Sequence, residues 1–586
     1  MRVVHFCSAA ALFLALSCCA QDIEGTWQTT VLDHGHFLRY VLHISKPHGA
    51  IAATLDVPEH FQFDTPVDSI SFDNSILNFR SGQVSYEGSP TGDGQAIQGS
   101  WSLTAGKATW QRISPGPKNK VEAVAKRLKS LMNLPEEEWK IHSGDIAQGE
   151  SIDLDDSSWQ IVGPNSTGPH DALWYRRWIE IPKSLNGYDL TGVKVWFDFQ
   201  DDANGPAMEI VYFNGRRVAM GDDLEPIVLF DAAKAGDKVL VTVKLLQTVD
   251  EKHFTGADLR IDFLAGRPDP AHLFQEMGAM STLAPYLGSA SVKLQTELAK
   301  AADAVDLDAL SRGDQAAFDA SLIQARAILL PLKDSIQETS VRLTGNSHID
   351  AAWLWPWTET VDVVRRTFGT ALQLMDEHPK FTYTQSAAAY SEWMMEKYPS
   401  VHQQILDRVK QGRWEMVGGM WVEPDLNMPD GESLVRQLLI GKRFFKNNFG
   451  TDVHIGWNPD SFGYNWQLPQ IYKRSGINYF VTQKMAWNDT NQLPMKLFWW
   501  QSPDGSRVLT YFPHDYVNEL EPQRIASDVS ALEVAHPGVP EMMHLYGVGD
   551  HGGGPDTSHA RGWRALVQTR CNFPQDQLRR CPRIFH

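Results

Sequence analysis

The sequence predicts a multidomain protein with two all-β domains, a helical linker and a final α/β domain of parallel strands. A chain of 586 residues is too long for a single hydrophobic core. Apolar residues alternate with polar ones through residues 22–113 and 134–265, and they change to helical spacing within residues 268–338. From Val341 onward, short apolar runs alternate with amphipathic segments, which is typical of strands and helices in a parallel sheet.

Residues 1–20 have the pattern of a secretory signal peptide. A basic start is followed by an apolar run, residues 9–16, that is too short to span a membrane. Small residues then precede Gln21, where cleavage is expected. The pattern predicts a secreted or periplasmic protein, with a possible lipid anchor at Cys18 or Cys19. The compact signal and the domain order favour a bacterial source.

The composition narrows the class of partner. A formal net charge of -18 disfavours binding to nucleic acid or anionic lipid and suits a neutral or cationic substrate. The chain has 20 Trp residues, whose flat faces either stack on sugar rings or fill β-rich cores. After the signal segment the only cysteines are Cys571 and Cys581, so the folded body is expected to rely on its cores and not on disulfides.

Residues 22–113 are expected to form a small β-barrel or β-sandwich. Residues 39–45 and 51–57 alternate and are bounded by proline or glycine. Gly25-Thr-Trp27 and Gly99-Ser-Trp101 stand near the two ends of the segment like opening and closing strands. Nothing in the residues indicates an activity, so the expected role is a binding or spacer module.

Residues 134–265 form the second predicted β domain. Four strand-like pieces with turn residues between them, at residues 155–159, 174–178, 195–199 and 208–215, resemble the galactose-binding-like jelly roll of many glycoside hydrolases. The alternative is a structural β-sandwich without a sugar site.

Two predicted helical segments flank this second domain. A short connector is expected within residues 114–133, and the linker of residues 268–338 has helical periodicity at 283–302 and 316–332.

The last domain is expected to place ligands at the C-terminal ends of its strands. The predicted strands are residues 341–345, 381–385, 414–417, 453–457 and 479–482, and the predicted helices are 360–378, 431–448 and 466–475, with further helical runs up to Gly412.

The first chemical motif, Asn346-Ser-His348-Ile-Asp350-Ala-Ala-Trp353, directly follows the first predicted strand of this domain. His348 and Asp350 are two residues apart, so in extended chain both side chains point the same way. An imidazole and a carboxylate are suitable Zn²⁺ ligands. The alternative is a hydrogen-bonded pair that stabilises a loop.

The second motif, Gly456-Trp-Asn-Pro-Asp460-Ser-Phe-Gly-Tyr464, also lies between a strand and a helix. Asp460 could ligate a metal, act as a nucleophile, or cap the helix expected from Trp466. From the residues alone, capping is the commonest use of such an aspartate.

Two further segments end strands of the same domain. Residues 417–425, which include Trp421, are expected to add an aromatic wall and a polar group to the site, or else to form an ordinary turn with a core Trp. The glycine-rich segment 546–555 contains Asp550 and His551 and allows close approach of a ligand. A phosphate-binding loop is disfavoured because no Lys-Ser/Thr pair follows it.

Together, and in their order along the chain over roughly residues 339–556, the four motifs resemble those of glycoside hydrolase family 38, the α-mannosidases. The resemblance implies a retaining, zinc-dependent enzyme acting on mannose-containing glycans. It implies that His348 and Asp350 are zinc ligands, that Asp460 is the nucleophile and also contacts the metal, and that Trp353 lies beneath the mannose ring. We assign Trp421 to substrate binding as well.

The motifs do not specify which residue is the general acid/base. Asp550 is the first choice because its loop lies at a strand end, and Asp515 is the second.

The resemblance also implies that the domain, residues 339–565, is incomplete at its C-terminus. The family has a further zinc-ligating His beyond the glycine-rich loop, then a helical domain and a large β domain. This sequence departs from the family after Pro555 and ends in an anomalous Arg- and Cys-containing tail, residues 566–586. His551 is an alternative fourth ligand, to which the family assigns no such role.

Two other functions compete with this interpretation. One is a carbohydrate-binding remnant without catalysis, which would bind mannosides and not hydrolyse them. The other is a zinc-dependent polysaccharide deacetylase, since His-x-Asp at a strand end also suits metal-activated water. The sequence predicts neither the linkage specificity nor the oligomeric state.

Overall fold

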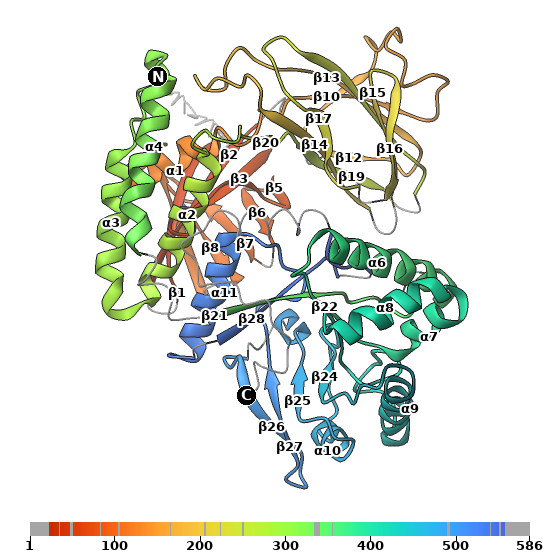
Figure 1. The fold of residues 1–586 in the computed structure, drawn as a ribbon. Helices are drawn as coiled ribbons and strands as arrows, with labels where there is room; N and C mark the ends of the chain where they lie inside the picture. Colours follow the sequence, from red (N-terminus) through yellow and green to blue (C-terminus); the bar gives the residue numbers. More distant parts are fainter. Residues whose placement is uncertain are drawn as a thin grey trace, which may run out of the picture. The chain divides into compact units, whose positions relative to one another are not determined.

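The computed structural model describes residues 23–33, 36–46, 51–82, 84–102, 106–164, 166–203, 207–222, 224–248, 251–332, 340–353, 355–488, 491, 493–539, 541–549, 552–556 and 559 (Figure 1). The predicted signal peptide with Cys18 and Cys19, the residues Asp550 and His551, and the anomalous tail with Cys571 and Cys581 lie outside these residues. The chain divides into two compact units, Met1–Gly116 and Pro117–His586.

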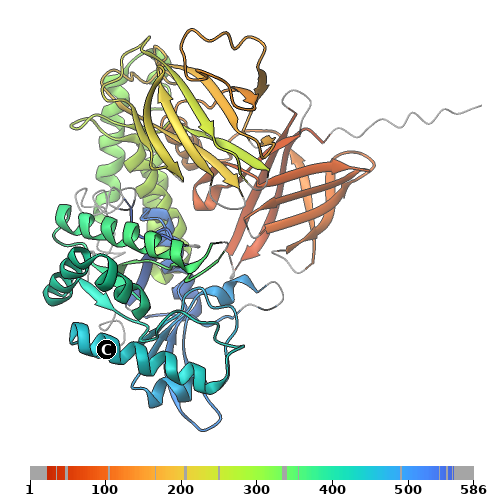
Figure 2. The same ribbon diagram turned by 90° about the vertical axis from the view of Figure 1, so that its right-hand side faces the viewer.

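The first unit contains one antiparallel sheet of nine strands in the order β4-β3-β2-β1-β9-β8-β7-β6-β5 (Figure 2). Alternation along the strands buries one face, where Trp27, Trp101 and Trp110 form the centre of the core. The strands are β1 Gly25–Asp33, β2 His36–Ser45, β3 Ala52–Val57, β4 Gln62–Pro66, β5 Ser69–Asp73, β6 Ile76–Ser81, β7 Val84–Pro90, β8 Ala96–Trp101 and β9 Gly106–Ile113.

One strand assignment in this unit was wrong. Gly99-Ser-Trp101 lies in β8 and not in the closing strand, which is β9. The sheet is completed by β9 because it pairs with both β8 and β1, so the first and last strands of the unit lie side by side.

The second unit begins with helix α1, Lys120–Lys129, and two antiparallel sheets. One sheet has the order β11-β10-β13-β18-β15-β16, and the other has the order β12-β19-β14-β17 with β20 paired to β14. Trp139 of the first sheet contacts Phe199 and Phe254 of the second at 5.9 and 6.1 Å between ring centroids. An aromatic core therefore lies between the sheets.

The bounds of these strands are β10 Trp139–Ser143, β11 Gln160–Val162, β12 Ser166–Gly168, β13 Leu173–Glu180, β14 Lys194–Ala203, β15 Met208–Phe213, β16 Arg216–Asp222, β17 Ile227–Phe230, β18 Lys238–Leu245, β19 Lys252–Asp258 and β20 Ile261–Asp262.

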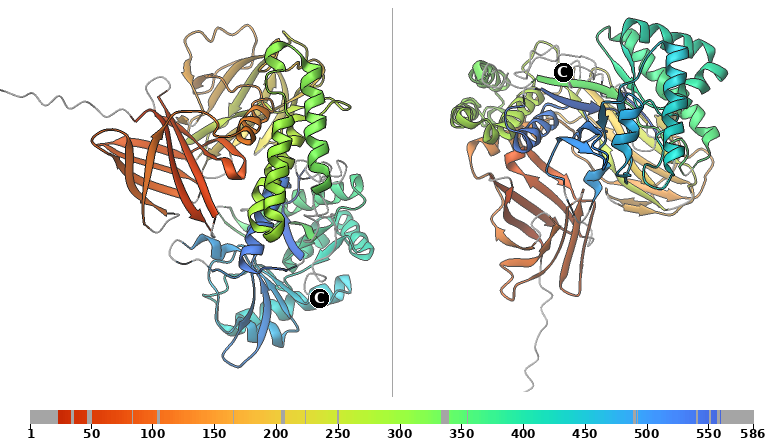
Figure 3. Two further views of the ribbon diagram at one scale, coloured as in Figure 1. Left: turned by 90° about the vertical axis from the view of Figure 1, so that its left-hand side faces the viewer. Right: turned by 90° about the horizontal axis from the view of Figure 1, so that it is seen from below.

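Three helices form the predicted linker: α2 Pro270–Leu283, α3 Ser291–Ala304 and α4 Gln315–Leu329 (Figure 3). The helical spacing predicted across residues 283–302 is interrupted, because α2 ends at Leu283 and α3 begins only at Ser291. Two short 3-10 turns fill the gap, where Pro285 lacks a backbone donor and Gly288 has a φ of 49°.

The final domain contains two four-stranded sheets. The first, β23-β22-β21-β28, is parallel throughout. The second has the order β24-β25-β27-β26, and β26 runs antiparallel to β27, which corrects the expectation of parallel strands only. The amide of Gly418, just after β23, donates to the carbonyl of Ile455 in β24 at 2.8 Å and so links the two sheets.

The strands of this domain are β21 Ser340–Asn346, β22 Tyr383–Gln385, β23 Trp414–Met416, β24 Ile455–Trp457, β25 Tyr479–Val481, β26 Leu497–Gln501, β27 Arg507–Tyr511 and β28 Glu541–Tyr546. The helices are α6 Trp357–Glu377, α7 Ala388–Lys397, α8 Pro399–Gln411, α9 Gly431–Phe449, α10 Leu468–Arg474 and α11 Pro522–Ala535. The five strands and three bounded helices predicted here are all present, with ends that differ by at most three residues.

No helix among the described residues is long and apolar enough to cross a membrane. The signal peptide, the lipid anchor, the bacterial source and the domain boundaries remain predictions from the sequence.

Candidate metal centre

Three side chains from two sheets converge at the C-terminal ends of their strands. His348 and Asp350 follow β21, and Asp460 follows β24. The Nε2 atom of His348 lies 3.2 Å from Asp350 Oδ1 and 3.3 Å from Asp460 Oδ2. One ligand atom from each residue lies within 4.8 Å of the other two, so the cluster could hold a metal ion.

The donor set and its spacing fit a divalent metal. A tetrahedral ion with bonds of about 2.0–2.1 Å requires ligand atoms about 3.3 Å apart, and the separations from His348 Nε2 match this value. His348 is almost wholly buried, whereas the carboxylates of Asp350 and Asp460 are partly exposed, with 23% and 14% of their side-chain surface accessible. The open side of the cluster therefore lies at the carboxylates, where a substrate can approach.

Glu423, in the turn after β23, orients the histidine from behind. Its Oε2 lies 3.0 Å from His348 Nδ1, and its Oε1 accepts a hydrogen bond from Ser386 Oγ. An Nδ1–H that donates to this carboxylate leaves Nε2 free to ligate a metal. The chain can turn here because Gly418 and Gly419 have φ values of 78° and 74°. Glu423 lies within the motif of residues 417–425, which predicted a polar group at the site but did not single out this residue.

The carboxylates also control protonation of His348. Burial by itself would lower the pKa of His348, but Glu423, Asp350 and Asp460 together raise that pKa well above its usual value. The same carboxylates that favour a proton on His348 also favour a bound cation.

Asp460 accepts two hydrogen bonds from the side facing away from His348. Tyr516 donates its hydroxyl proton to Oδ1 at 2.6 Å, and the Lys484 ammonium donates to the same oxygen. Burial raises the pKa of Asp460, but the hydrogen bonds from His348, Lys484 and Tyr516 outweigh it and hold the pKa well below its usual range. Asp460 is therefore ionised at neutral pH.

Asp460 is not a helix cap. Helix α10 begins at Leu468, its N-cap residue is Gln467, and no side chain caps it. Lys484 and Tyr516 were missed in the sequence, although both lie in loops after strands, β25 and β27, where the strand-end rule would have placed them.

A cavity of about 300 Å³ opens over the cluster. This volume is at the lower end of the range for small-molecule sites, about 300–1,000 Å³. The lining residues are His348, Asp350, Glu423, Pro424, Asp425, Leu426, Asn427, Met428, Asp460, Ser461, Phe462 and Gly463.

Neither predicted tryptophan is among the residues that line this cavity. Trp421 is half-buried and packs edge-on against Phe444 of α9 at 5.9 Å between centroids, and its role in substrate binding remains a prediction. Trp353 is 41% exposed and packs against Trp355 at 5.4 Å. Its place beneath a sugar ring remains a prediction.

The two predicted acid/base residues differ in what can be said of them. Asp515 is engaged in a turn: Oδ1 accepts from the Tyr516 amide at 2.8 Å, and Oδ2 accepts from Arg524 at 3.1 Å. Asp550 lies outside the described residues, but Gly549 and Gly552, which flank it in the sequence, lie close to His348 and Ile349. Gly552 forms a β-bridge with Ile349, and a Cβ on Gly549 would lie 3.4 Å from the amide nitrogen of His348.

Comparison with known proteins shows what this segment is similar to. Residues 338–577 match the model described as Glycosyl hydrolases family 38 N-terminal domain. The segment is similar to a glycosidase domain. Alpha-mannosidase G of Dictyostelium discoideum is 39% identical over 247 residues, which cover 41% of this chain and 22% of that protein. Alpha-mannosidase 2C1 of Homo sapiens is 42% identical over 246 residues, 41% of this chain and 23% of that protein.

The alpha-mannosidase of Saccharomyces cerevisiae is 40% identical over 223 residues, which cover 37% of this chain and 20% of that protein. The chain therefore spans about a fifth of the length of each of these three relatives. The solved structure of an alpha-mannosidase from Enterococcus faecalis V583 aligns with a TM-score of 0.35 and 17% identity, covering 42% of this chain and 29% of that chain. The sequence comparisons support a glycosidase and agree with the family resemblance of the four motifs.

Proposed function

We propose that this chain carries the catalytic part of a retaining, zinc-dependent α-mannosidase that removes terminal α-linked mannose from glycans. The observation that carries the proposal is the convergence of His348, Asp350 and ionised Asp460 beneath one cavity, within a segment similar to family 38. The names of the related proteins supply the substrate class.

His348, Asp350 and Asp460 would hold the zinc ion, with Glu423 fixing the imidazole. Zinc prefers nitrogen and oxygen ligands of this kind, and when bound it would supply Lewis-acid stabilisation and orient sugar hydroxyls. The Asp460 carboxylate attacks the anomeric carbon, and the bond from that carbon to the leaving oxygen breaks. Water then displaces Asp460, so two inversions retain the configuration.

Lys484 and Tyr516 act on Asp460 in both halves of the reaction. Their hydrogen bonds keep the carboxylate ionised for attack and stabilise it again when it leaves. A second carboxyl must protonate the leaving oxygen and later accept a proton from water. We propose Asp550 for this role, and Asp515 second, because Asp515 is already held by Arg524 and by turn amides.

Hydrolysis of 4-nitrophenyl α-mannoside tests the proposal directly. Release of 4-nitrophenol is expected with Zn²⁺ and not with excess chelator, and the first sugar product seen by NMR should have the α configuration. The β-mannoside serves as the control substrate. Binding of mannoside without turnover by the folded, zinc-loaded chain would overturn the proposal in favour of a carbohydrate-binding remnant, and acetate release from an acetylated polysaccharide would favour a deacetylase.

Glu423→Gln is expected to weaken Zn²⁺ binding about 10- to 100-fold, the usual effect of removing an outer-shell partner. Glutamine has one acceptor oxygen, whereas both His348 Nδ1 and Ser386 Oγ need one. Competition with a zinc chelator measures the affinity. Glu432→Gln, on the exposed face of α9, is the matched control. Equal affinities of the two variants would exclude the orienting role of Glu423.

A further inference from the structure

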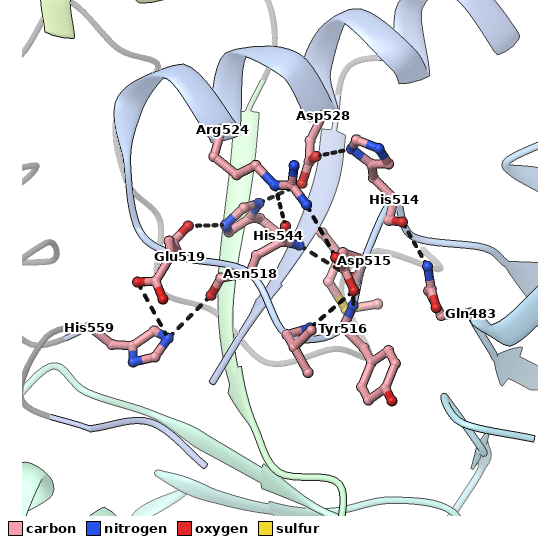
Figure 4. A network of polar contacts seen from close by, with 12 residues as sticks. Gln483, His514, Asp515, Tyr516, Asn518, Glu519, Arg524, Asp528, His544 and His559 are labelled. Atoms are coloured by element: carbon pink, nitrogen blue, oxygen red, sulfur yellow. Dashed lines mark hydrogen bonds and ion pairs between the residues drawn. The ribbon is translucent and has the colours of Figure 1, made fainter. Parts of the chain in front are cut away.

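A buried carboxylate lies outside the metal centre, on helix α11. Only 4% of the Asp528 side chain is accessible, and both of its oxygens are engaged. Oδ1 accepts from His514 Nδ1 at 2.6 Å, and Oδ2 accepts from His544 Nδ1 at 2.7 Å (Figure 4). Burial would raise the pKa of Asp528, but the two histidines hold that pKa well below its usual range. Burying a charged carboxylate is costly unless its oxygens accept hydrogen bonds. Both oxygens of Asp528 do so, which distinguishes it from an ordinary surface aspartate.

The two histidines connect Asp528 to the two ends of one loop. This loop, residues 514–519, is the central part of the connection between β27 and α11. His514 is the first residue of this loop. His544, in β28, is fully buried, and its Nε2 lies 3.1 Å from the carbonyl oxygen of Glu519, the last residue of the loop. The neighbours of its two ring nitrogens are the Asp528 carboxylate and the Glu519 carbonyl oxygen, both of which are hydrogen-bond acceptors. Asp528 thus fastens one end of the loop directly and the other through His544 (Figure 4).

The loop carries Tyr516, which contacts the metal centre. Its hydroxyl donates to Asp460 at 2.6 Å, and its ring packs edge-on against His348 at 5.9 Å between centroids. The Tyr516 carbonyl accepts from Asn346 Nδ2 at 2.9 Å, which ties the middle of the loop to β21. Because Tyr516 is only 2% exposed and packed on several sides, a small shift of the loop ends would move its hydroxyl away from Asp460.

Helix α11, which carries Asp528, is held in place by its own contacts with neighbouring elements. It packs along α2, and the Ser530 hydroxyl, two residues from Asp528, lies 3.3 Å from the Thr282 carbonyl. Arg524, one turn earlier on α11, bonds Asp515 at 3.1 Å and Asn518 at 2.8 Å. The two bonds of Arg524 therefore join the loop to α11 in addition to the contacts of Asp528.

We infer that Asp528 is a positioning residue, which anchors both ends of the 514–519 loop through His514 and His544 and so holds the Tyr516 hydroxyl against Asp460. The inference rests on the proposed function, because it concerns how Asp460 is prepared for reaction. Asp528 touches neither the substrate cavity nor the metal cluster and acts only through Tyr516.

The first test does not depend on activity. Asp528→Asn keeps the shape but replaces one acceptor oxygen with a donor, so one of the two histidine bonds is lost. Amide hydrogen exchange in residues 514–519 is expected to accelerate about tenfold or more. Ser530→Ala, a buried polar change on the same helix, is the control and should leave exchange in this loop unchanged. Unchanged exchange in Asp528→Asn, or equal acceleration in both variants, would overturn the inference.

The second test separates positioning from general destabilisation. Asp528→Asn and Tyr516→Phe are each expected to lower kcat/KM for 4-nitrophenyl α-mannoside about tenfold, the equivalent of one hydrogen bond in the transition state. If Asp528 acts through Tyr516, the double variant loses about tenfold and not about a hundredfold. If the losses of Asp528→Asn and Tyr516→Phe multiply in the double variant, the inference is contradicted. As the control pair, Ser530→Ala and Tyr516→Phe should have effects on kcat/KM that multiply.

The two proposals fail in different ways. A folded, zinc-loaded wild-type chain that hydrolyses no α-mannoside contradicts the proposed function, while hydrogen exchange in residues 514–519 still decides whether Asp528 clamps the loop.

Discussion

Asp460→Asn should reduce kcat/KM for 4-nitrophenyl α-mannoside by about a thousandfold or more. The substitution removes the anionic oxygen that attacks the sugar and one charged oxygen of the metal cluster. It also leaves Lys484 and the Tyr516 hydroxyl facing a neutral amide in place of the carboxylate that they stabilise. Initial rates at several substrate concentrations with saturating Zn²⁺ measure the loss.

Asp425→Asn is the matched control for this experiment. Asp425 lines the same cavity and undergoes the same change of charge, but its Oδ1 accepts from the turn amides of Asn427 and Met428 and not from Lys484 or Tyr516. This variant is expected to keep its activity within about threefold, since it loses only a turn contact. Similar losses in the two variants would mean that the negative charge of the cavity, and not nucleophilic attack by Asp460, supports hydrolysis.

His348→Ala should weaken Zn²⁺ binding by more than about a hundredfold, because removing a ligand exceeds the effect of removing an outer-shell partner. In the cluster of His348, Asp350 and Asp460, the histidine supplies the one nitrogen ligand. Its Nε2 atom lies 3.2 Å from the carboxylate of Asp350 and 3.3 Å from that of Asp460. Wild-type activity should disappear with chelator and return with Zn²⁺, whereas the variant should recover none of it. Calorimetric titration of the metal-free proteins with Zn²⁺ measures the affinities.

His454→Ala provides the control for the loss of an imidazole. His454 precedes β24, is about half exposed, and bonds the carbonyl of Gly476 away from the cluster. The His454→Ala variant should bind Zn²⁺ with the affinity of the wild type and should regain the same activity when Zn²⁺ is restored after chelation. Full reactivation of His348→Ala by Zn²⁺ would exclude this cluster as the metal site.

Local signals explain why the elements of the final domain were predictable. The strand and helix positions follow from apolar periodicity and from breakers such as Pro379, Gly412 and Gly450, which act within a few residues of each end. Where the prediction was wrong, the deciding contact was distant. Strand β9 is recognised by its pairing with β1, about 85 residues earlier, and the direction of β26 depends on β27.

The role of Trp421 shows the same limit. Its position at a strand end made it a reasonable wall for the site, and nothing in its own neighbourhood distinguishes a cavity residue from a packing residue. Its ring packs against Phe444 of α9, a contact that the sequence did not indicate, and its role in substrate binding remains a prediction.

By itself, the sequence determined that His348, Asp350 and Asp460 follow buried strands in motifs that resemble those of one family, because strand periodicity and motif spacing are properties of short stretches of chain. Only the tertiary structure decided which partners each carboxylate contacts. Glu423 reaches His348 across 75 residues, Tyr516 reaches Asp460 across 56, and Asp528 joins two histidines of different elements. Such partners are selected by how strands and helices pack in space, and that packing is not encoded in the spacing of any single motif.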